Sequence, residues 1–193
     1  MAFVASISNE EVAALDAVQF DGEIVVVDNA AALADACRYL AGQSLIGFDT
    51  ETRPSFTAGV TNKVALLQLF GGEKCFLVRL NRVGLSRDVV ALLQNPAIAK
   101  IGAAVSNDIL SLNALRHFKA RGFIDLQTLV GDYGIEDKSL RKISGIVLGK
   151  KVSKAQRLSN WEAKILTPQQ QMYAATDAWV CVEIFKKLTS SKA

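Results

Sequence analysis

A pair of acidic residues, separated by one position, follows an apolar run in the first third of the chain. The run Leu45–Phe48 leads directly into Asp49, Thr50 and Glu51. Because side chains alternate between the two faces of a strand, we expect Asp49 and Glu51 to point the same way. Two carboxylates this close repel each other, and their ionised forms are costly on an apolar element unless a cation lies between them. Such a pair, with oxygen ligands only, favours Mg²⁺ or Mn²⁺ over zinc.

Two further acids lie among apolar residues in predicted helices. Asp108 is near the start of its helix, and Leu112 and Leu115 share its face. Asp177 follows Tyr173 by four residues in the last helix and lies in an apolar stripe. An unpaired carboxylate in such a stripe is costly, so both acids are candidates for the same cation site. Taken singly, Asp108 is also explained as an acid at a helix N-terminus and Asp177 as a residue at the edge of the core.

The remaining pattern predicts the elements that position these acids. Apolar and β-branched runs predict strands over residues 23–28, 44–51, 64–70, 75–78, 97–102 and 123–125, with the third and fourth joined as a hairpin. Helical spacing and caps predict helices over residues 9–17, 29–41, 89–93, 126–133 and 167–188, and another starting near residue 106. This order indicates an α/β fold, a mixed sheet covered on both faces. We expect residues 1–22 to form a weakly patterned lead-in and residues 23–190 to form a single domain.

Length and composition limit the class of protein. The chain has 193 residues, of which 50% are apolar, so one domain with a substantial core is expected. It has no apolar run near the roughly 20 residues of a membrane span, and its first residues lack the basic flank of a signal peptide. Cys37, Cys75 and Cys181 are odd in number and far apart, which favours neither disulfides nor a zinc cluster. We therefore expect a cytoplasmic protein without disulfides or a membrane segment.

The formal net charge of +3 is unevenly distributed. Up to Glu51 the only basic residue is Arg38. Residues 138–164, here called the basic segment, oppose a single acid, Glu162, with Lys138, Arg141, Lys142, Lys150, Lys151, Lys154, Arg157 and Lys164. Such a block is typical of a surface that binds a polyanion. A solvated, lysine-rich surface is the simpler alternative.

Three segments resemble the three exonuclease motifs of the DEDD superfamily of 3′–5′ exonucleases. They are Phe48–Thr52, the stretch from Lys100 to Asp108, and Tyr173–Ala178, in the order and spacing of that superfamily. Tyrosine four residues before the last aspartate is the signature of the tyrosine branch (DEDDy). The histidine branch has His one position earlier, where this chain has Met172. The only histidine, His117, lies apart from the motif acids and is expected on a surface helix.

The resemblance covers nearly the whole chain from about residue 23. Leu66–Leu69 and Phe123–Leu126 are similar to strand segments of the family. Lys154–Thr167 is similar to the segment before the third motif in exonuclease domains of the Werner-syndrome helicase type and their bacterial relatives. Ribonuclease D resembles this chain less closely. The resemblance implies a ribonuclease H-like fold, in which a mixed five-stranded sheet is flanked by helices.

The resemblance also implies a metal-dependent reaction. Asp49, Glu51, Asp108 and Asp177 match the family acids that hold two divalent cations, Mg²⁺ or Mn²⁺, about 3.5–4 Å apart. One ion lowers the pKa of the attacking water and the other stabilises the departing 3′ oxygen, so that nucleoside 5′-monophosphates leave one at a time. Tyr173, with an ordinary pKa of about 10, is expected to orient the water rather than to act as a base.

Contacts to the substrate are expected from residues beside the motifs. Lys154 and Arg157 are candidate phosphate ligands. Trp161 is a candidate stacking surface for the terminal nucleotide, with core packing as its alternative. Thr50 and Asn107 are further candidates for contacts with the strand, although a capping role is the simpler account of Asn107.

Two other functions are alternatives to the exonuclease. A catalytically silent nucleic-acid-binding module gains nothing from an anionic site that faces phosphates. A two-metal endonuclease acting on hybrids is disfavoured by the spacing of Tyr173 and Asp177 and by the segment Ser159–Trp161. We therefore predict a 3′–5′ exonuclease acting on nucleic acid with a free 3′ end. DNA is favoured and RNA is the alternative, because no residue is assigned to a 2′-hydroxyl, and we make no prediction of oligomeric state.

Overall fold

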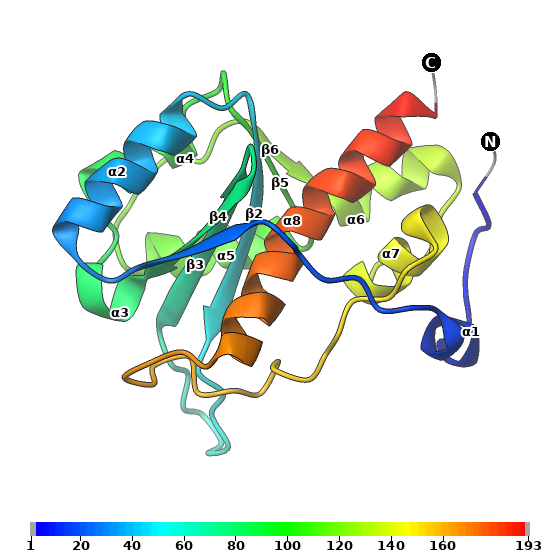
Figure 1. The fold of residues 1–193 in the computed structure, drawn as a ribbon, viewed down its shortest axis with the longest axis horizontal. Helices are drawn as coiled ribbons and strands as arrows, with labels where there is room; N and C mark the ends of the chain where they lie inside the picture. The colour runs from blue at the N-terminus through cyan, green and yellow to red at the C-terminus, as the bar shows by residue number, and fades with distance from the viewer. Residues whose placement is uncertain (1–2, 192–193) are drawn as a thin grey trace.

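One mixed sheet forms the centre of the protein, described by a computed structural model over residues 3–191 (Figure 1). Its strands are β1 (Glu23–Val27), β2 (Leu45–Thr52), β3 (Val64–Gly71), β4 (Lys74–Arg79), β5 (Ala99–Gly102) and β6 (Phe123–Asp125). They lie in the order β1-β4-β3-β2-β5-β6, with β3 antiparallel to both neighbours and the other pairs parallel. The predicted α/β fold with a mixed sheet is confirmed. The five-stranded sheet implied by the resemblance is corrected to six strands, because all six strand ranges predicted from the pattern pair, with β1 and the short β6 at opposite edges.

Helices connect the strands and cover both faces of the sheet. They are α1 (Asn9–Ala14), α2 (Ala30–Ala41), α3 (Leu80–Val83), α4 (Arg87–Gln94), α5 (Val105–Asn113), α6 (Leu126–Leu129) with a 3₁₀ turn at Val130–Tyr133, α7 (Leu140–Leu148) and α8 (Pro168–Ser190). α8 starts where predicted, because Thr167 and Gln170 form a reciprocal capping box. α1 is shorter than predicted, because the backbone becomes extended at Leu15. Among the described helices, none is both long and apolar enough to cross a membrane.

Alternation along the strands divides the core into two layers. On β3, Leu66 belongs to the layer that includes α7 and α8, whereas Leu67 belongs to the layer that includes α2 and α4. Every residue of β3 is buried, as expected of a strand covered on both faces. Figure 1 shows α8 running across one side of the sheet, with α2 and α4 on the other. The central strands, including the acid-bearing β2, are therefore held between two packed layers.

α8 approaches the sheet very closely at Gly47 of β2. A Cβ atom at this position would lie 2.0 Å from the backbone oxygen of Ala178, so no larger residue fits unless α8 moves. Asp177 precedes Ala178 on α8, and Asp49 follows Gly47 by two positions on β2. This contact between backbones therefore brings one acid from each element to the same place.

The N-terminal lead-in packs against the basic segment. Asp16 and Lys150 form an ion pair at 2.9 Å, and Ala17 makes a parallel bridge with Lys151. The backbone N–H of Phe20 donates a hydrogen bond of 3.1 Å to a threonine hydroxyl of α8. Part of the basic segment therefore binds the acidic N-terminal part of its own chain, and the described lead-in residues lie on the domain rather than apart from it.

Candidate active site

Three carboxylates converge where β2 passes beneath α8. Asp49 and Glu51 lie together on β2, as the alternation predicts, and Asp177 joins them from α8. One oxygen from each residue lies within 4.8 Å of the other two. The cluster contains only oxygen ligands, which suit a hard divalent cation such as Mg²⁺ or Mn²⁺.

The fourth acid, Asp108, approaches from α5. β2 pairs with β5 only as far as Gly47, so the edge of β2 beyond that residue faces α5. There the hydroxyl of Thr50 donates a hydrogen bond of 2.5 Å to Asp108. Thr50 thus holds an acid, a different role from the substrate contact predicted for it. On α5, Leu112 is buried as predicted, whereas Leu115 follows the end of the helix.

Asp125, an acid that the sequence pattern does not single out, holds the start of α5. Its carboxylate oxygens accept hydrogen bonds from the backbone N–H groups of Ala104 at 3.0 Å, Val105 at 3.1 Å and Gln127 at 2.9 Å. α5 has no side-chain cap of its own, and Ala104 has a left-handed φ of 61°. Asp125 therefore supplies the missing cap for the turn that carries Asp108. Its place at the end of the predicted strand 123–125, which proves parallel to β5, is the signal that could have identified it.

Replacing Asp125 by alanine should lower the free energy of unfolding by about 1–3 kcal/mol, because three backbone N–H groups lose their acceptor. Urea denaturation measures the change. Asp132→Ala removes an exposed acid in the nearby 3₁₀ turn and should stay within about 0.5 kcal/mol of wild type. Equal stability of the two variants would contradict the capping role of Asp125.

Burial raises the pKa of every acid in the site, and repulsion from the other acids of the site adds to the rise for Asp49 and Glu51. Burial, followed by the charges of Asp177 and Asp108, raises the pKa of Glu51 to about 9. Burial and the same neighbours raise the pKa of Asp49 well above its ordinary value. Burial also raises the pKa of Asp177 to about 7 and that of Asp108 to about 6, each against a neighbouring hydroxyl that lowers it. Four ionised acids are therefore unfavourable here without a cation, which fits a divalent-cation site.

The metal-free protein is expected to lose stability as the pH rises. The pKa values of about 6, 7 and 9 for Asp108, Asp177 and Glu51 keep protons on the folded protein that the unfolded chain, with ordinary values of 3.8 and 4.5, releases. Because the folded state binds more protons in this interval, the free energy of unfolding falls with rising pH. Melting temperatures in EDTA should fall between about pH 5 and about pH 8, and Mn²⁺ should raise them most at the higher pH. Glu51→Gln should flatten the slope, and a pH-independent melting temperature of the wild type would contradict the prediction.

Tyr173 lies beside the carboxylates, with Trp161 packed against it. Burial, followed by the charge of Asp177, raises the pKa of the Tyr173 phenol above its ordinary value, so the phenol stays protonated at neutral pH and is no general base. The ring of Trp161 lies 6.0 Å from that of Tyr173, and Trp161 is 0% exposed. The predicted stacking of Trp161 on a nucleotide is therefore corrected to its alternative, core packing that supports Tyr173.

The sequence also matches a known family over almost its whole length. A sequence profile described as 3′–5′ exonuclease matches residues 24–191, which include all four acids and Tyr173. The chain belongs to this 3′–5′ exonuclease family. Its tyrosine-branch motifs are the residues that the fold brings together around Asp49.

Relatives of this exonuclease-family chain include longer enzymes. The bifunctional 3′–5′ exonuclease/ATP-dependent helicase WRN of Mus musculus is 32% identical in an alignment of 183 residues, which covers 89% of this chain and 13% of that protein. The Nibbler EXO domain of Aedes aegypti is 26% identical with a TM-score of 0.75, over 88% of this chain and 90% of that one. RNase D of Escherichia coli is described as an exoribonuclease involved in structured RNA processing. It is 26% identical with a TM-score of 0.78, over 87% of this chain and 44% of that one. The expected ribonuclease H-like fold is confirmed by these neighbours, and the chain spans 13% to 56% of the length of the first curated relatives it matches.

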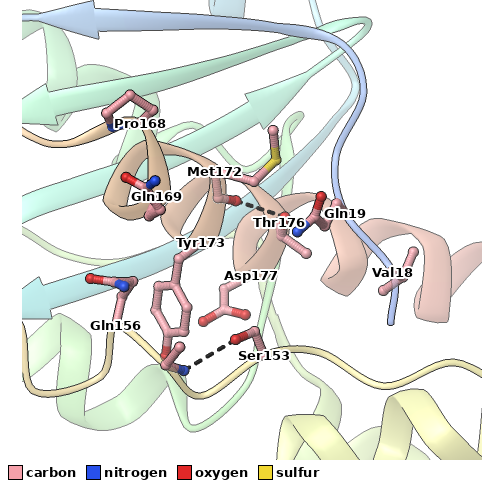
Figure 2. Close-up of a pocket in the computed structure, with 11 residues that line it drawn as sticks. Val18, Gln19, Ser153, Gln156, Pro168, Gln169, Met172, Tyr173, Thr176 and Asp177 are labelled. Carbon is pink, nitrogen blue, oxygen red and sulfur yellow. Dashed lines mark hydrogen bonds between the residues drawn. The ribbon is translucent and has the colours of Figure 1, made fainter. Parts of the chain in front are cut away.

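A pocket of about 350 Å³ opens beside Tyr173 and Asp177 of this exonuclease domain (Figure 2). The lead-in forms one wall, the loop 153–156 forms another, and the first turns of α8 lie between them. Its polar lining includes the neutral amides of Gln19, Gln156 and Gln169. None of the described residues that line it is basic. This lining suits a neutral group with a hydrogen-bonding edge better than it suits a phosphate.

The other predicted substrate contacts occupy exposed positions. Lys154 and Arg157 are exposed in and beside the turn that follows Ser153, and Asn107 is exposed in the first turn of α5. Asn107 is not the cap of that helix, because the cap position is three residues earlier. His117 is exposed as expected, but it follows the end of α5 instead of lying on a helix. Contacts of Lys154, Arg157 and Asn107 with a strand stay predictions.

Proposed function

We propose that this chain is a metal-dependent 3′–5′ exonuclease that hydrolyses nucleic acid to nucleoside 5′-monophosphates. The observation that carries the proposal is the cluster of Asp49, Glu51 and Asp177 within 4.8 Å, in a chain of the 3′–5′ exonuclease family. Asp108 and Tyr173 complete the set, and both interact electrostatically with the cluster. A silent binding module is disfavoured, because this cluster repels phosphates unless cations neutralise it.

In the proposed mechanism the four acids hold two divalent cations, Mg²⁺ or Mn²⁺. Bound there, the cations would activate a water and stabilise negative charge on the departing 3′ oxygen. Asp49 would be shared by both ions, with Glu51 and Asp177 completing one and Asp108 supporting the other. The phenol of Tyr173, which burial keeps protonated, would orient the attacking water by a hydrogen bond.

The pocket beside Tyr173 is the proposed position of the terminal nucleoside. Its neutral amides, such as those of Gln19 and Gln156, offer hydrogen bonds to a base edge. The exposed Lys154 and Arg157 would meet phosphates of the strand. DNA stays the favoured substrate on the Werner-type resemblance of the segment before α8, a resemblance with which the 32% identity to WRN agrees. The likeness to RNase D, described as an exoribonuclease, supports RNA as the second candidate.

Incubation with end-labelled substrates tests the proposal directly. The purified chain is mixed with 5′-labelled single-stranded DNA, a recessed-end duplex or RNA, in Mg²⁺, Mn²⁺ or EDTA. The expected result is a ladder that shortens from the 3′ end only with metal, with nucleoside 5′-monophosphates recovered by chromatography. A circular single strand, which has no 3′ end, should stay intact. Relative rates on the three linear substrates then identify the preferred one.

Two outcomes would overturn the exonuclease proposal. Metal-dependent cutting of the circle would identify an endonuclease. Binding of all substrates without any shortening would identify a silent binding module. Asp49→Asn, purified in the same way, is the matched control and should shorten the linear substrates far more slowly than the wild type.

A further inference from the structure

A small group of buried polar atoms, in two central strands and in the loop before α8, has no hydrogen-bond partner. Among residues 3–191, these atoms are Nε2 and Oε1 of Gln68, Nε of Arg79 and Nε1 of Trp161. The three side chains are at most 1% exposed. A buried polar group without a partner costs free energy, so its presence calls for a physical reason.

Arg79 and Trp161 have other contacts that account for their burial. Arg79 donates through Nη2 to the backbone oxygen of Ala163 at 2.5 Å, which ties β4 to the loop before α8. Trp161 contributes a large apolar surface to the core and supports Tyr173. Gln68 differs from both, because neither end of its amide forms a hydrogen bond and it offers little apolar surface in exchange. An apolar residue of the same length would fill its place without the loss of hydration.

Strand register places Gln68 directly beside Asp49. The two residues are cross-strand partners in the antiparallel pair of β2 and β3. Side chains of such partners project to the same face, with Cβ atoms about 4.5–5.5 Å apart. Leu66 and Leu77, which flank Gln68 on that face, belong to the core layer of α8, so the amide of Gln68 lies under α8 as Asp49 does. The acid directly opposite Gln68 in the sheet is therefore Asp49, a carboxylate of the site.

We infer that Gln68 is a positioning residue, whose amide N–H donates to the carboxylate of Asp49 when a divalent cation is bound and so sets its orientation. The inference rests on the proposed function, in which Asp49 holds the cation. An oxygen of Asp49 that is not bound to a cation needs a donor, and Gln68 is the unpaired donor opposite it in the sheet. Hydrogen bonds to ligating carboxylates orient them and commonly change metal affinity by about 10–100-fold when removed.

The inference predicts opposite effects of one substitution on stability and on metal affinity. Gln68→Met keeps the length of the side chain and removes both unpaired atoms, so its melting temperature in EDTA should equal or exceed that of wild type. Its dissociation constant for Mn²⁺, measured by titration calorimetry on the full chain, should rise about 10-fold or more. The value of kcat should fall with little change in KM, because Gln68 is buried and does not touch the strand.

Leu77→Met is the matched control, because Leu77 is the partner of Gln68 on β4, on the side away from Asp49. It should bind Mn²⁺ like wild type. Wild-type Mn²⁺ affinity in Gln68→Met would overturn the inference. A melting temperature of Gln68→Met below those of wild type and Leu77→Met would also overturn it, because the amide would then stabilise the fold.

Absence of Mn²⁺ binding by the wild type would overturn the proposed function together with the inference. A failure of the Gln68 inference alone leaves binding by the wild type, and its loss in Asp49→Asn, intact.

Discussion

Asp49→Asn should lower the rate of 3′-end hydrolysis by about 1000-fold or more, because the acids of such a site act as a unit. Asparagine keeps the shape of the side chain and loses the charge that a divalent cation requires. Asp49 is also the acid whose ionised form is opposed by burial and by three carboxylates, those of Asp177, Asp108 and Glu51. Removing it should therefore raise the melting temperature in EDTA at neutral pH, while Mn²⁺ no longer raises it further.

Two measurements check this prediction, single-turnover hydrolysis of a labelled strand and thermal unfolding with and without Mn²⁺. Asp21→Asn, at an exposed position in the lead-in, is the control and should match wild type in both. A variant that loses activity and also unfolds at a lower temperature in EDTA would indicate a structural role for Asp49. Activity within a few fold of wild type would remove Asp49 from the proposed mechanism.

Gly47→Ala should have the largest effect on stability, about 3 kcal/mol or more in the free energy of unfolding. Its methyl group would lie 2.0 Å from the backbone oxygen of Ala178, and a backbone atom has no rotamer through which to move away. α8 must therefore shift from β2, and it carries Asp177 with it. The affinity for Mn²⁺ should fall in the fraction that folds, because Asp177 and Asp49 no longer meet at the present spacing.

Urea denaturation and Mn²⁺ titration measure the two effects of Gly47→Ala. Gly131→Ala is the matched control, because the nearest atom to its added methyl group is Nζ of Lys138 at 4.0 Å. That control should be as stable as wild type to within about 1 kcal/mol. Equal stability of Gly47→Ala and Gly131→Ala would contradict a tight backbone contact between α8 and β2.

Much of the candidate site could be predicted because its signals are local. The alternation of a strand orients Asp49 and Glu51 together, and the helical repeat places Tyr173 one turn before Asp177. The capping box at Thr167 marks the start of α8 within the residues that form it. These features depend on neighbours in the chain, so residue types and spacing are sufficient to predict them.

Other parts of the site depend on contacts between distant segments. From the sequence, Trp161 is equally compatible with a stacking surface for a nucleotide and with a core residue. Only the tertiary structure, in which the loop before α8 buries its side chain completely, identifies it as a core residue. The cap that Asp125 supplies to α5 requires two parallel strands to lie side by side. Part of the basic segment forms an ion pair with the acidic lead-in. The number of charges in the sequence does not show whether a basic residue binds an acid of its own chain or nucleic acid.

By itself the sequence determined the identity of the acids, their faces on β2, α5 and α8, and the family to which the chain belongs. The tertiary structure alone decided how closely those acids meet, which backbone contact at Gly47 holds them, and that the unpaired amide of Gln68 lies beside Asp49. The physical reason is one of range. Periodicity and capping act over a few residues, whereas burial, cross-strand pairing and the raised pKa values of the acids arise only when segments far apart in the chain exclude water together.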